Sequence, residues 1–319
     1  MRRISADEFS TRKHAAQRQA FTLVELMIVV VVIAVLMGLL LPAVMGAFRR
    51  ARIMEVVTEI RGLEAAIAQF KSVYGVEPPS RFRLYENATG AISWQSHSGT
   101  FTDPVTGATL SHDAERTRSI AIINRIWPNF NFSANLGDLD GTSATYISLT
   151  GAECLVFFLG GRPVSGGTGV YALTGFSKNP ANPFLAASGT ESREGPFYEF
   201  KPSRLKPSLN TNNPNVLVYF DPTGGQTAPY VYASSNDGRG YQAADLYVGS
   251  SDDLNDIYRT TTAANAVAQK PKSFQIISPG ADGFYGAGGY FSATASNHGL
   301  TDRRDYDNVT NFHGGLLSE

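Results

Sequence analysis

Cysteine is almost absent from this chain, which has 319 residues and a single cysteine, Cys154. An intramolecular disulfide is therefore excluded, so any stapling of an exported domain must come from packing or from a metal ion. Cys154 precedes the apolar run Val156-Phe-Phe-Leu159. In such surroundings a cysteine is more often a small core residue than a nucleophile.

The familiar catalytic motifs are missing as well. The sequence has no H-E-x-x-H, G-x-S-x-G, P-loop or C-x-x-C pattern, and its five histidines are scattered through polar segments. We therefore predict that the protein is not an enzyme. A net charge of -1 gives no electrostatic basis for binding nucleic acid, so no nucleic-acid partner is predicted.

Long apolar runs are scarce, apart from one near the N-terminus. From Phe21 to Leu41 only Thr22, Glu25 and Gly38 interrupt the apolar side chains. This is about the ~20 residues that a helix needs to cross the hydrocarbon core of a bilayer. The basic segment before the span favours a cytoplasmic N-terminus, although arginines that closely follow the span weaken this bias.

The helical pattern continues beyond the span, with apolar residues at steps of three or four. These residues are Val44, Phe48, Ala51, Met54, Val57, Ile60, Leu63, Ile67, Phe70 and Tyr74. Charged residues, Glu55 and Glu59 among them, fall between these positions. The pattern predicts an amphipathic helix over residues 42–75, which ends at Gly75.

The rest of the chain predicts a globular domain of short strands and long loops. We expect a loop-rich segment over 77–112, a helix over 113–127 and a short helix over 154–159, the last preceded by a capping-box spacing. Short runs of β-branched or aromatic residues predict strands at 197–200, 216–220, 230–233 and 274–277. The second and third of these are expected to form a hairpin.

The N-terminal stretch Ala20-Phe21-Thr22-Leu-Val-Glu25-Leu, followed by an apolar run that reaches Pro42, resembles the class III signal of type IV pilins and type II secretion pseudopilins. The resemblance implies that a prepilin peptidase cuts between Ala20 and Phe21 and that the new amine is methylated. The helices of many subunits would then bundle into a filament. Ala20 stands where glycine is usual.

The resemblance also implies an α+β fold, in which the long N-terminal helix packs on a C-terminal antiparallel sheet with long loops. The expected parts are a leader (1–20), a transmembrane helix (21–41), an amphipathic stalk helix (42–75) and a periplasmic pilin-like domain (76–319). The protein would be a single-pass protein of the bacterial inner membrane. Its partners would be the prepilin peptidase, membrane lipid, copies of itself, other pilin-like subunits and an inner-membrane assembly platform.

Glu25 is a carboxylate inside a predicted membrane span, where an unpaired charge is costly. After cleavage, the freed amine of Phe21 lies near the membrane surface, and Glu25 of one subunit could pair with the Phe21 amine of a neighbour. The alternative is that Glu25 reaches the headgroups from the end of an uncleaved anchor.

A second region with chemical content lies near the C-terminus, where Gly-rich sequence between Ser278 and Gly289 is followed by Asp305-Tyr-Asp307-Asn308. It resembles the calcium loop of major pseudopilins, with Asn308 at the place of the second aspartate. The predicted Ca²⁺ ligands are Asp305, Asp307, Asn308, Ser278 and Asp282, since hard cations prefer such oxygens. The alternative is a cluster of Gly/Asp turns without a metal.

The function that these features favour is that of a structural subunit, a pseudopilin of a type II secretion-like system that drives protein export. A type IV pilin for adhesion, motility or DNA uptake is a closely related alternative. A third possibility, from another class, is a membrane-anchored enzyme or binding domain that uses a pilin-type anchor.

Overall fold

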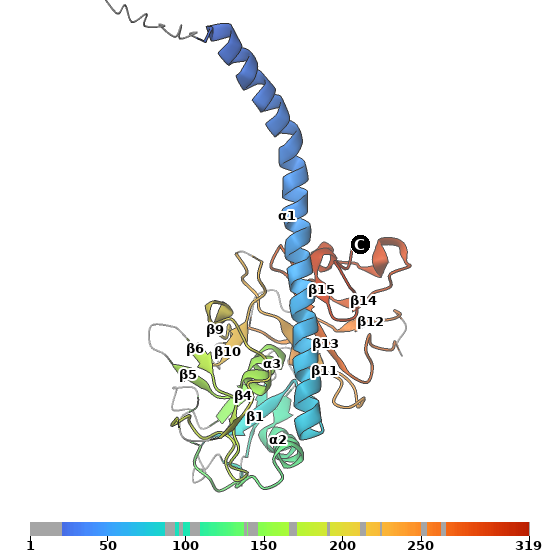
Figure 1. Cartoon of the computed structure of the whole chain (residues 1–319). Helices are drawn as coiled ribbons and strands as arrows, with labels where there is room; N and C mark the ends of the chain where they lie inside the picture. The colour runs from blue at the N-terminus through green and yellow to red at the C-terminus, as the bar shows by residue number, and fades with distance from the viewer. Residues whose placement is uncertain are drawn as a thin grey trace, which may run out of the picture. The chain divides into compact units, whose positions relative to one another are not determined.

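The computed structural model in Figure 1 describes most of the chain. The described residues are 21–86, 93–95, 98–102, 109–136, 139, 146–165, 171–189, 192–210, 215–223, 225–249, 254–262 and 266–318. The chain divides into two compact units, Met1–Arg50 and Ala51–Glu319. Each unit is described by itself.

The longest element is the helix α1, Leu23–Tyr74. Within the second unit its buried side chains are Val56, Val57, Ile60, Leu63, Ala66, Ile67 and Phe70. Most of the apolar positions expected there are therefore confirmed, whereas Met54 remains 53% exposed. The helix ends where Gly75 adopts a φ of 75° and donates its backbone N–H to the carbonyl of Lys71 at 2.8 Å.

Two shorter helices confirm the local signals read from the sequence. Helix α2 spans His112–Ile126 and is followed by Trp127 and a proline. Helix α3 spans Gly151–Gly160, and its ten residues are all buried. The capping box at its start is present, since the carboxylate of Glu153 accepts the backbone N–H of Thr150 at 2.9 Å. Cys154 lies in α3 as a buried free thiol, in agreement with the core role predicted for it.

The strands are short. They are β1 Phe82–Tyr85, β2 Thr100–Thr102, β3 Thr109–Ser111, β4 Tyr146–Leu149, β5 Pro163–Ser165, β6 Tyr171–Leu173, β7 Phe176–Ser177, β8 Arg193–Glu194, β9 Leu205–Pro207, β10 Leu217–Tyr219, β11 Val231–Ser234, β12 Tyr258–Arg259, β13 Phe274–Ser278, β14 Gly289–Tyr290 and β15 Val309–Thr310. Four 3₁₀ turns accompany them: η1 Pro202–Arg204, η2 Ala243–Leu246, η3 Ser296–Gly299 and η4 Arg303–Asp307.

These strands form small separate sheets within the described part of the chain. The largest has three antiparallel strands in the order β11-β13-β15. The pairs β1-β4, β2-β3, β5-β6, β7-β8 and β9-β10 are antiparallel, and the pair β12-β14 is parallel. A long helix followed by small, mainly antiparallel sheets is an α+β arrangement, so the predicted fold class is confirmed.

Two apolar clusters hold the second unit together. The first contains buried apolar residues of α1, α2 and α3. In it the ring of Phe70 lies 5.9 Å from Phe158 and 5.3 Å from Phe197. The second lies around β11, β13 and the C-terminal loop and includes Tyr258 and Tyr285. The C-terminal loop is therefore anchored by apolar contacts with the rest of the second unit.

Three expectations about strands were wrong. β10 and β11 do not form a hairpin, because β10 pairs with β9 and β11 pairs with β13. Tyr230, just before β11, donates its backbone N–H to the carbonyl of Tyr219 in β10 at 2.8 Å, but no ladder follows among the described residues. Residues 197–200 form no strand, since their aromatic rings pack into the core instead. The strand β1 lies in the segment expected to be loop-rich, with Arg83 only 2% exposed.

Candidate functional site

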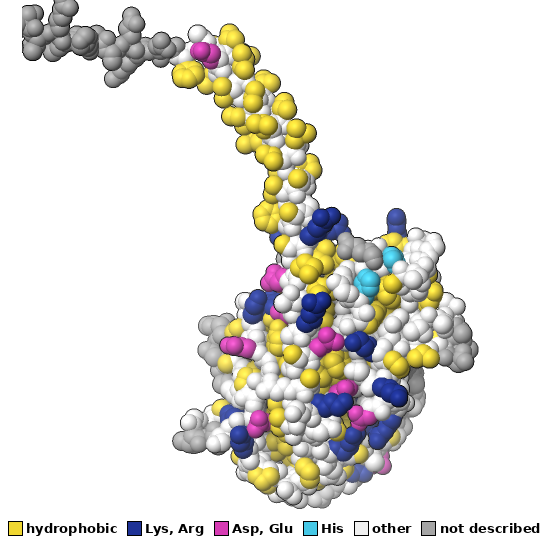
Figure 2. All heavy atoms as spheres, turned by 45° about the vertical axis from the view of Figure 1, so that its right-hand side comes forward, with side chains coloured by type: hydrophobic (Ala, Val, Ile, Leu, Met, Phe, Trp, Pro, Cys, Tyr) yellow, Lys and Arg dark blue, Asp and Glu magenta, His cyan; other side chains and the backbone are white. Residues whose placement is uncertain are grey.

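The N-terminal part of α1 carries an almost unbroken apolar surface. The large side chains from Phe21 to Leu41 are 45–81% exposed. Hydrophobic side chains cover this helix on the face shown in Figure 2. Among the described residues, α1 is the one helix long and apolar enough to cross a membrane, and such a surface is stable in lipid rather than in water.

Glu25 closes the first turn of this helix. Its Oε2 accepts the backbone N–H of Thr22 and the Thr22 hydroxyl, both at 2.9 Å. The Thr22 hydroxyl in turn accepts the backbone N–H of Glu25 at 3.2 Å. The sequence Thr-x-x-Glu is thus a capping box at the start of the apolar helix, a second role for Glu25 that the sequence reading missed.

The cap uses one of the two carboxylate oxygens. Both hydrogen bonds from Thr22 end on Oε2, which leaves Oε1 of the exposed Glu25 for a further donor. Phe21, the residue whose amine is predicted to be that donor in a neighbouring subunit, is 81% exposed. Ala20, on the other side of the predicted cut, lies outside the described residues.

In the C-terminal loop, Asp307 organises the Gly-rich turn. Its Oδ2 accepts the backbone N–H groups of Ala281 and Asp282, at 2.7 and 2.9 Å. Gly280 has a φ of 68°, and a Cβ at this position would lie 2.2 Å from the carbonyl oxygen of Asp307. The turn can approach Asp307 this closely because residue 280 is glycine.

Asp305 is completely buried and already has several donors. It accepts the Tyr258 hydroxyl at 2.7 Å, the Gly288 N–H at 2.9 Å and the Ala287 N–H at 3.2 Å. Burial raises the pKa of Asp305 to about 6, and these hydrogen bonds oppose the rise. Asn308, also buried, donates its side-chain amide to the Tyr258 hydroxyl and to the carbonyl of Tyr285, at 2.8 and 2.7 Å.

The remaining predicted ligands, Ser278 and Asp282, also make hydrogen bonds. The Ser278 hydroxyl donates to Asp221, and Asp282 accepts the Phe284 N–H at 2.8 Å. Two buried oxygens, Asp307 Oδ1 and Asn308 Oδ1, have no hydrogen-bond partner in the described structure. Across the residues described, no group of three or more His, Cys, Asp or Glu side chains is arranged to hold a metal ion.

A buried ion pair on α1 was not predicted from the sequence. Glu59 pairs with Arg204 and accepts hydroxyl hydrogen bonds from Tyr230 at 2.7 Å and Tyr219 at 3.0 Å. Arg204 also lies over the Tyr219 ring, 4.5 Å from its centre. Burial, and then the charge of Glu59, raises the pKa of both tyrosines, so their hydroxyls remain donors.

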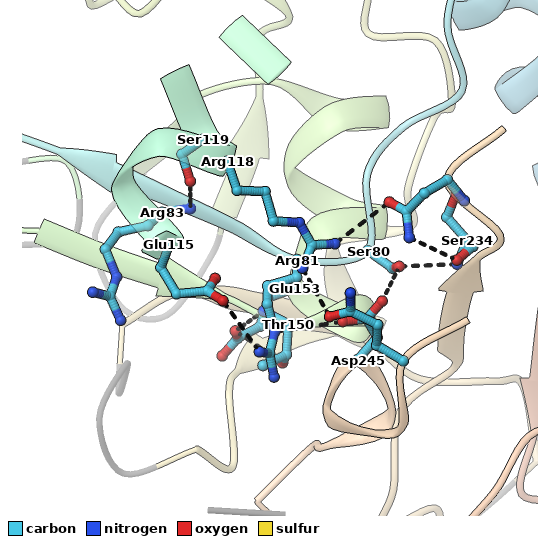
Figure 3. A network of polar contacts seen from close by, with 12 residues as sticks. Ser80, Arg81, Arg83, Glu115, Arg118, Ser119, Thr150, Glu153, Ser234 and Asp245 are labelled. Carbon is cyan, nitrogen blue, oxygen red and sulfur yellow. Dashed lines mark hydrogen bonds and ion pairs between the residues drawn. The ribbon is translucent and has the colours of Figure 1, made fainter. Parts of the chain in front are cut away.

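A second buried polar network, shown in Figure 3, joins segments that are distant in sequence. The Ser80 hydroxyl donates to Asp245 at 2.6 Å and accepts the Ser234 N–H at 2.9 Å. Arg81 lies 3.5 Å from Asp245 and 3.6 Å from Glu115. These contacts tie α2, β11 and η2 to the segment that precedes β1, which is a structural role.

The comparisons with known proteins concern the N-terminal region. Residues 16–41 match the family model described as the prokaryotic N-terminal methylation motif. This match covers both sides of the predicted cut, the capping box and the apolar stretch. No curated protein and no solved structure matches the chain.

Proposed function

We propose that this protein is a structural subunit of a pilus-like filament, a pseudopilin of a type II secretion-like system that drives protein export. The observation that carries the proposal is the methylation motif at residues 16–41 at the head of an exposed apolar helix. That motif supports a type IV pilin-like or pseudopilin subunit. The choice of a secretion system rests on the resemblance of the C-terminal loop to the calcium loop of pseudopilins.

The proposed mechanism follows from the first turn of α1. A prepilin peptidase of the inner membrane removes residues 1–20, and Phe21 then carries a positively charged amine. Oε2 of Glu25 stays in the capping box, while Oε1 accepts the amine of a neighbouring subunit. In lipid such a pair neutralises two charges that would otherwise be unpaired. It therefore favours helices that are packed side by side and in register.

Processing is expected to give a mature chain that begins at N-methylated Phe21. The physical reason is that the small Ala20 side chain precedes the cut and that an intact capping box begins the helix directly after it. Mass spectrometry of the N-terminal peptide of membrane-purified protein checks this. A mature protein that retains Met1, or one that is cut after Pro42, would refute the processing step.

Ca²⁺ in the C-terminal loop forms part of the proposal. Two buried oxygens, Asp307 Oδ1 and Asn308 Oδ1, have no hydrogen-bond partner within the described residues. Together with carbonyl oxygens of the Gly-rich turn, they are the type of ligand that coordinates a hard cation such as Ca²⁺. Asp305, Ser278 and Asp282 then support the loop through the hydrogen bonds that they already make.

Calcium is therefore expected to raise the melting temperature of the protein. An ion that binds only the folded state stabilises it by about 2.7 kcal/mol at a concentration a hundredfold above Kd, which corresponds to roughly 5–10 °C. The measurement compares detergent-solubilised protein in calcium and in chelator. Asp307→Ala should lose the shift, and Asp113→Ala, on α2 with a side chain 59% exposed and paired with Arg116, should keep it. Equal melting of the parent protein in both buffers would leave a turn cluster without a metal.

A further inference from the structure

A cleft of about 290 Å³ opens in the second unit, away from both regions considered so far. It lies between one face of α2, the segment that follows α1 and the turn after β11. Its lining includes Val76, Pro79, Ile122 and Ile126 on the apolar side, and Glu77, Arg118, Arg125, Asn236, Asp237, Arg239 and Gln242 on the polar side. The volume suits a ligand about as large as one or two amino-acid residues.

Arginines dominate the polar side of this cleft. Arg118 extends from α2 and donates to Gln242 at 2.9 Å and to Asn236 at 3.4 Å. These two bonds fix the plane of its guanidinium, which has five N–H donors in total. Figure 3 shows Arg118 beside the buried network. The buried Asp245 attracts Arg118 electrostatically, but its ion pair is with Arg81, at 3.5 Å.

The acidic groups of the lining offset this positive charge only in part. Asp237 is paired with Arg125 at 2.6 Å. Glu77 is paired with Lys71 through Oε1 at 3.0 Å, and its side chain is only 8% exposed; its Oε2 is buried and has no hydrogen-bond partner in the described part of the chain. Arg118 and Arg239 have no ion pair within 4 Å among the described residues. The accessible part of the cleft therefore favours an anion.

The apolar wall decides which kind of anion fits. A planar guanidinium binds carboxylate and phosphate equally well by geometry. Val76 and Ile122, however, are partly exposed in the same cleft, so they offer contact to an aliphatic group attached close to the anion. A peptide C-terminus combines a carboxylate with a side chain on the adjacent carbon atom, and its capture is a recurring mode of peptide recognition.

We propose that this cleft binds the C-terminal carboxylate of a peptide whose last residue is aliphatic. Arg118 is the anchoring donor, Arg125 can exchange Asp237 for the ligand, and the apolar wall receives the last side chain. This site would give the protein a peptide-binding capacity that is independent of filament formation, because it uses no residue of the motif at 16–41.

The test uses the full chain in detergent and the peptide acetyl-Gly-Ser-Leu, titrated by calorimetry as the free acid and as the C-terminal amide. The amide enters micelles at least as readily, so it controls for detergent. A charge-assisted hydrogen bond contributes about 1.5–3 kcal/mol. The parent protein should therefore bind the amide at least about tenfold more weakly than the free acid. Arg118→Gln should bind the free acid at least about tenfold more weakly than the parent protein does.

Arg304→Gln, which removes an exposed arginine paired with Asp302 outside the cleft, should bind the free acid like the parent protein. Tryptophan fluorescence shows whether Arg118→Gln folds. If it does not, the titration is done with Arg125→Gln, because Arg125 is 46% exposed and its substitution should disturb the fold less. Equal affinity for acid and amide, no binding of the acid, or inorganic phosphate binding as tightly as the acid would overturn the proposal. None of these outcomes bears on cleavage at Phe21.

Discussion

Glu25→Ala is expected to leave membrane insertion and cleavage intact and to abolish filament assembly. Without the carboxylate, the amine of a neighbouring Phe21 has no counter-charge in a lipid environment. Truncating one partner of a buried charge pair costs about 2–5 kcal/mol, and each 1.4 kcal/mol is a tenfold change in the association constant. The measurement is the amount of the protein in a sheared filament fraction, relative to the amount in the membrane.

The capping box makes Glu25→Gln the decisive control. In the parent protein the Thr22 N–H lies 2.9 Å from Oε2 of Glu25. Glutamine keeps an oxygen that can accept this N–H, but it carries no charge. If charge pairing is what matters, Glu25→Gln should fail to assemble as Glu25→Ala does, while Glu25→Asp should be milder. Normal assembly of the glutamine variant would show that Glu25 acts only as a helix cap.

Glu59→Ala is expected to cause the largest loss of stability in the second unit. The substitution leaves Arg204, whose side chain is 14% exposed, without its carboxylate. It also removes the acceptor for the hydroxyls of Tyr198, Tyr219 and Tyr230. Breaking a buried ion pair from one side costs about 3–5 kcal/mol. The free energy of unfolding is measured by urea denaturation of the detergent-solubilised chain, followed by the fluorescence of Trp94 and Trp127, both of which are buried in this unit.

Glu55→Ala is the matched control for this experiment. Glu55 lies one turn earlier on the same helix and forms an exposed pair with Lys201 at 3.6 Å, where both side chains are more than half exposed. Such pairs contribute about 0–1 kcal/mol. A loss of stability in Glu59→Ala as small as that in Glu55→Ala would mean that the tyrosine-lined ion pair does not secure α1.

The elements that the sequence predicted well are those with strong local signals. Helix α3 follows from a capping box with Glu153, and α1 ends where Gly75 takes a left-handed conformation. Strand β11 pairs with the distant β13, so its partner could not be predicted from its own residues. Strand β10 pairs with β9, a segment in which no strand was predicted. The strand β1 was missed because it contains the buried Arg83. The guanidinium of Arg83 lies 4.9 and 4.4 Å from the ring centres of Phe101 and Tyr146 and 2.7 Å from His112, and these partners are distant in sequence.

The candidate sites also differ in whether their residues are close together in the sequence or come from distant segments. The residues of the N-terminal motif are contiguous in sequence, so the motif at 16–41 is recognised without a structure. Glu59 was assigned to the polar face, although Val56 three residues before it and Leu63 four residues after it are both buried. That spacing places Glu59 on the buried side of the helix. The cleft beside Arg118 was not foreseen, because its walls come from three distant segments.

Whether this protein is built into a filament can be measured on the filaments themselves. The protein would be expressed with its prepilin peptidase and assembly platform, and sheared fibres would be labelled with an antibody against residues 76–319. We expect label along the fibres, and Phe21 as the N-terminus of the labelled chain. Correctly processed protein that stays in the membrane as monomers, with unlabelled fibres, would exclude a filament subunit and favour a membrane-anchored domain.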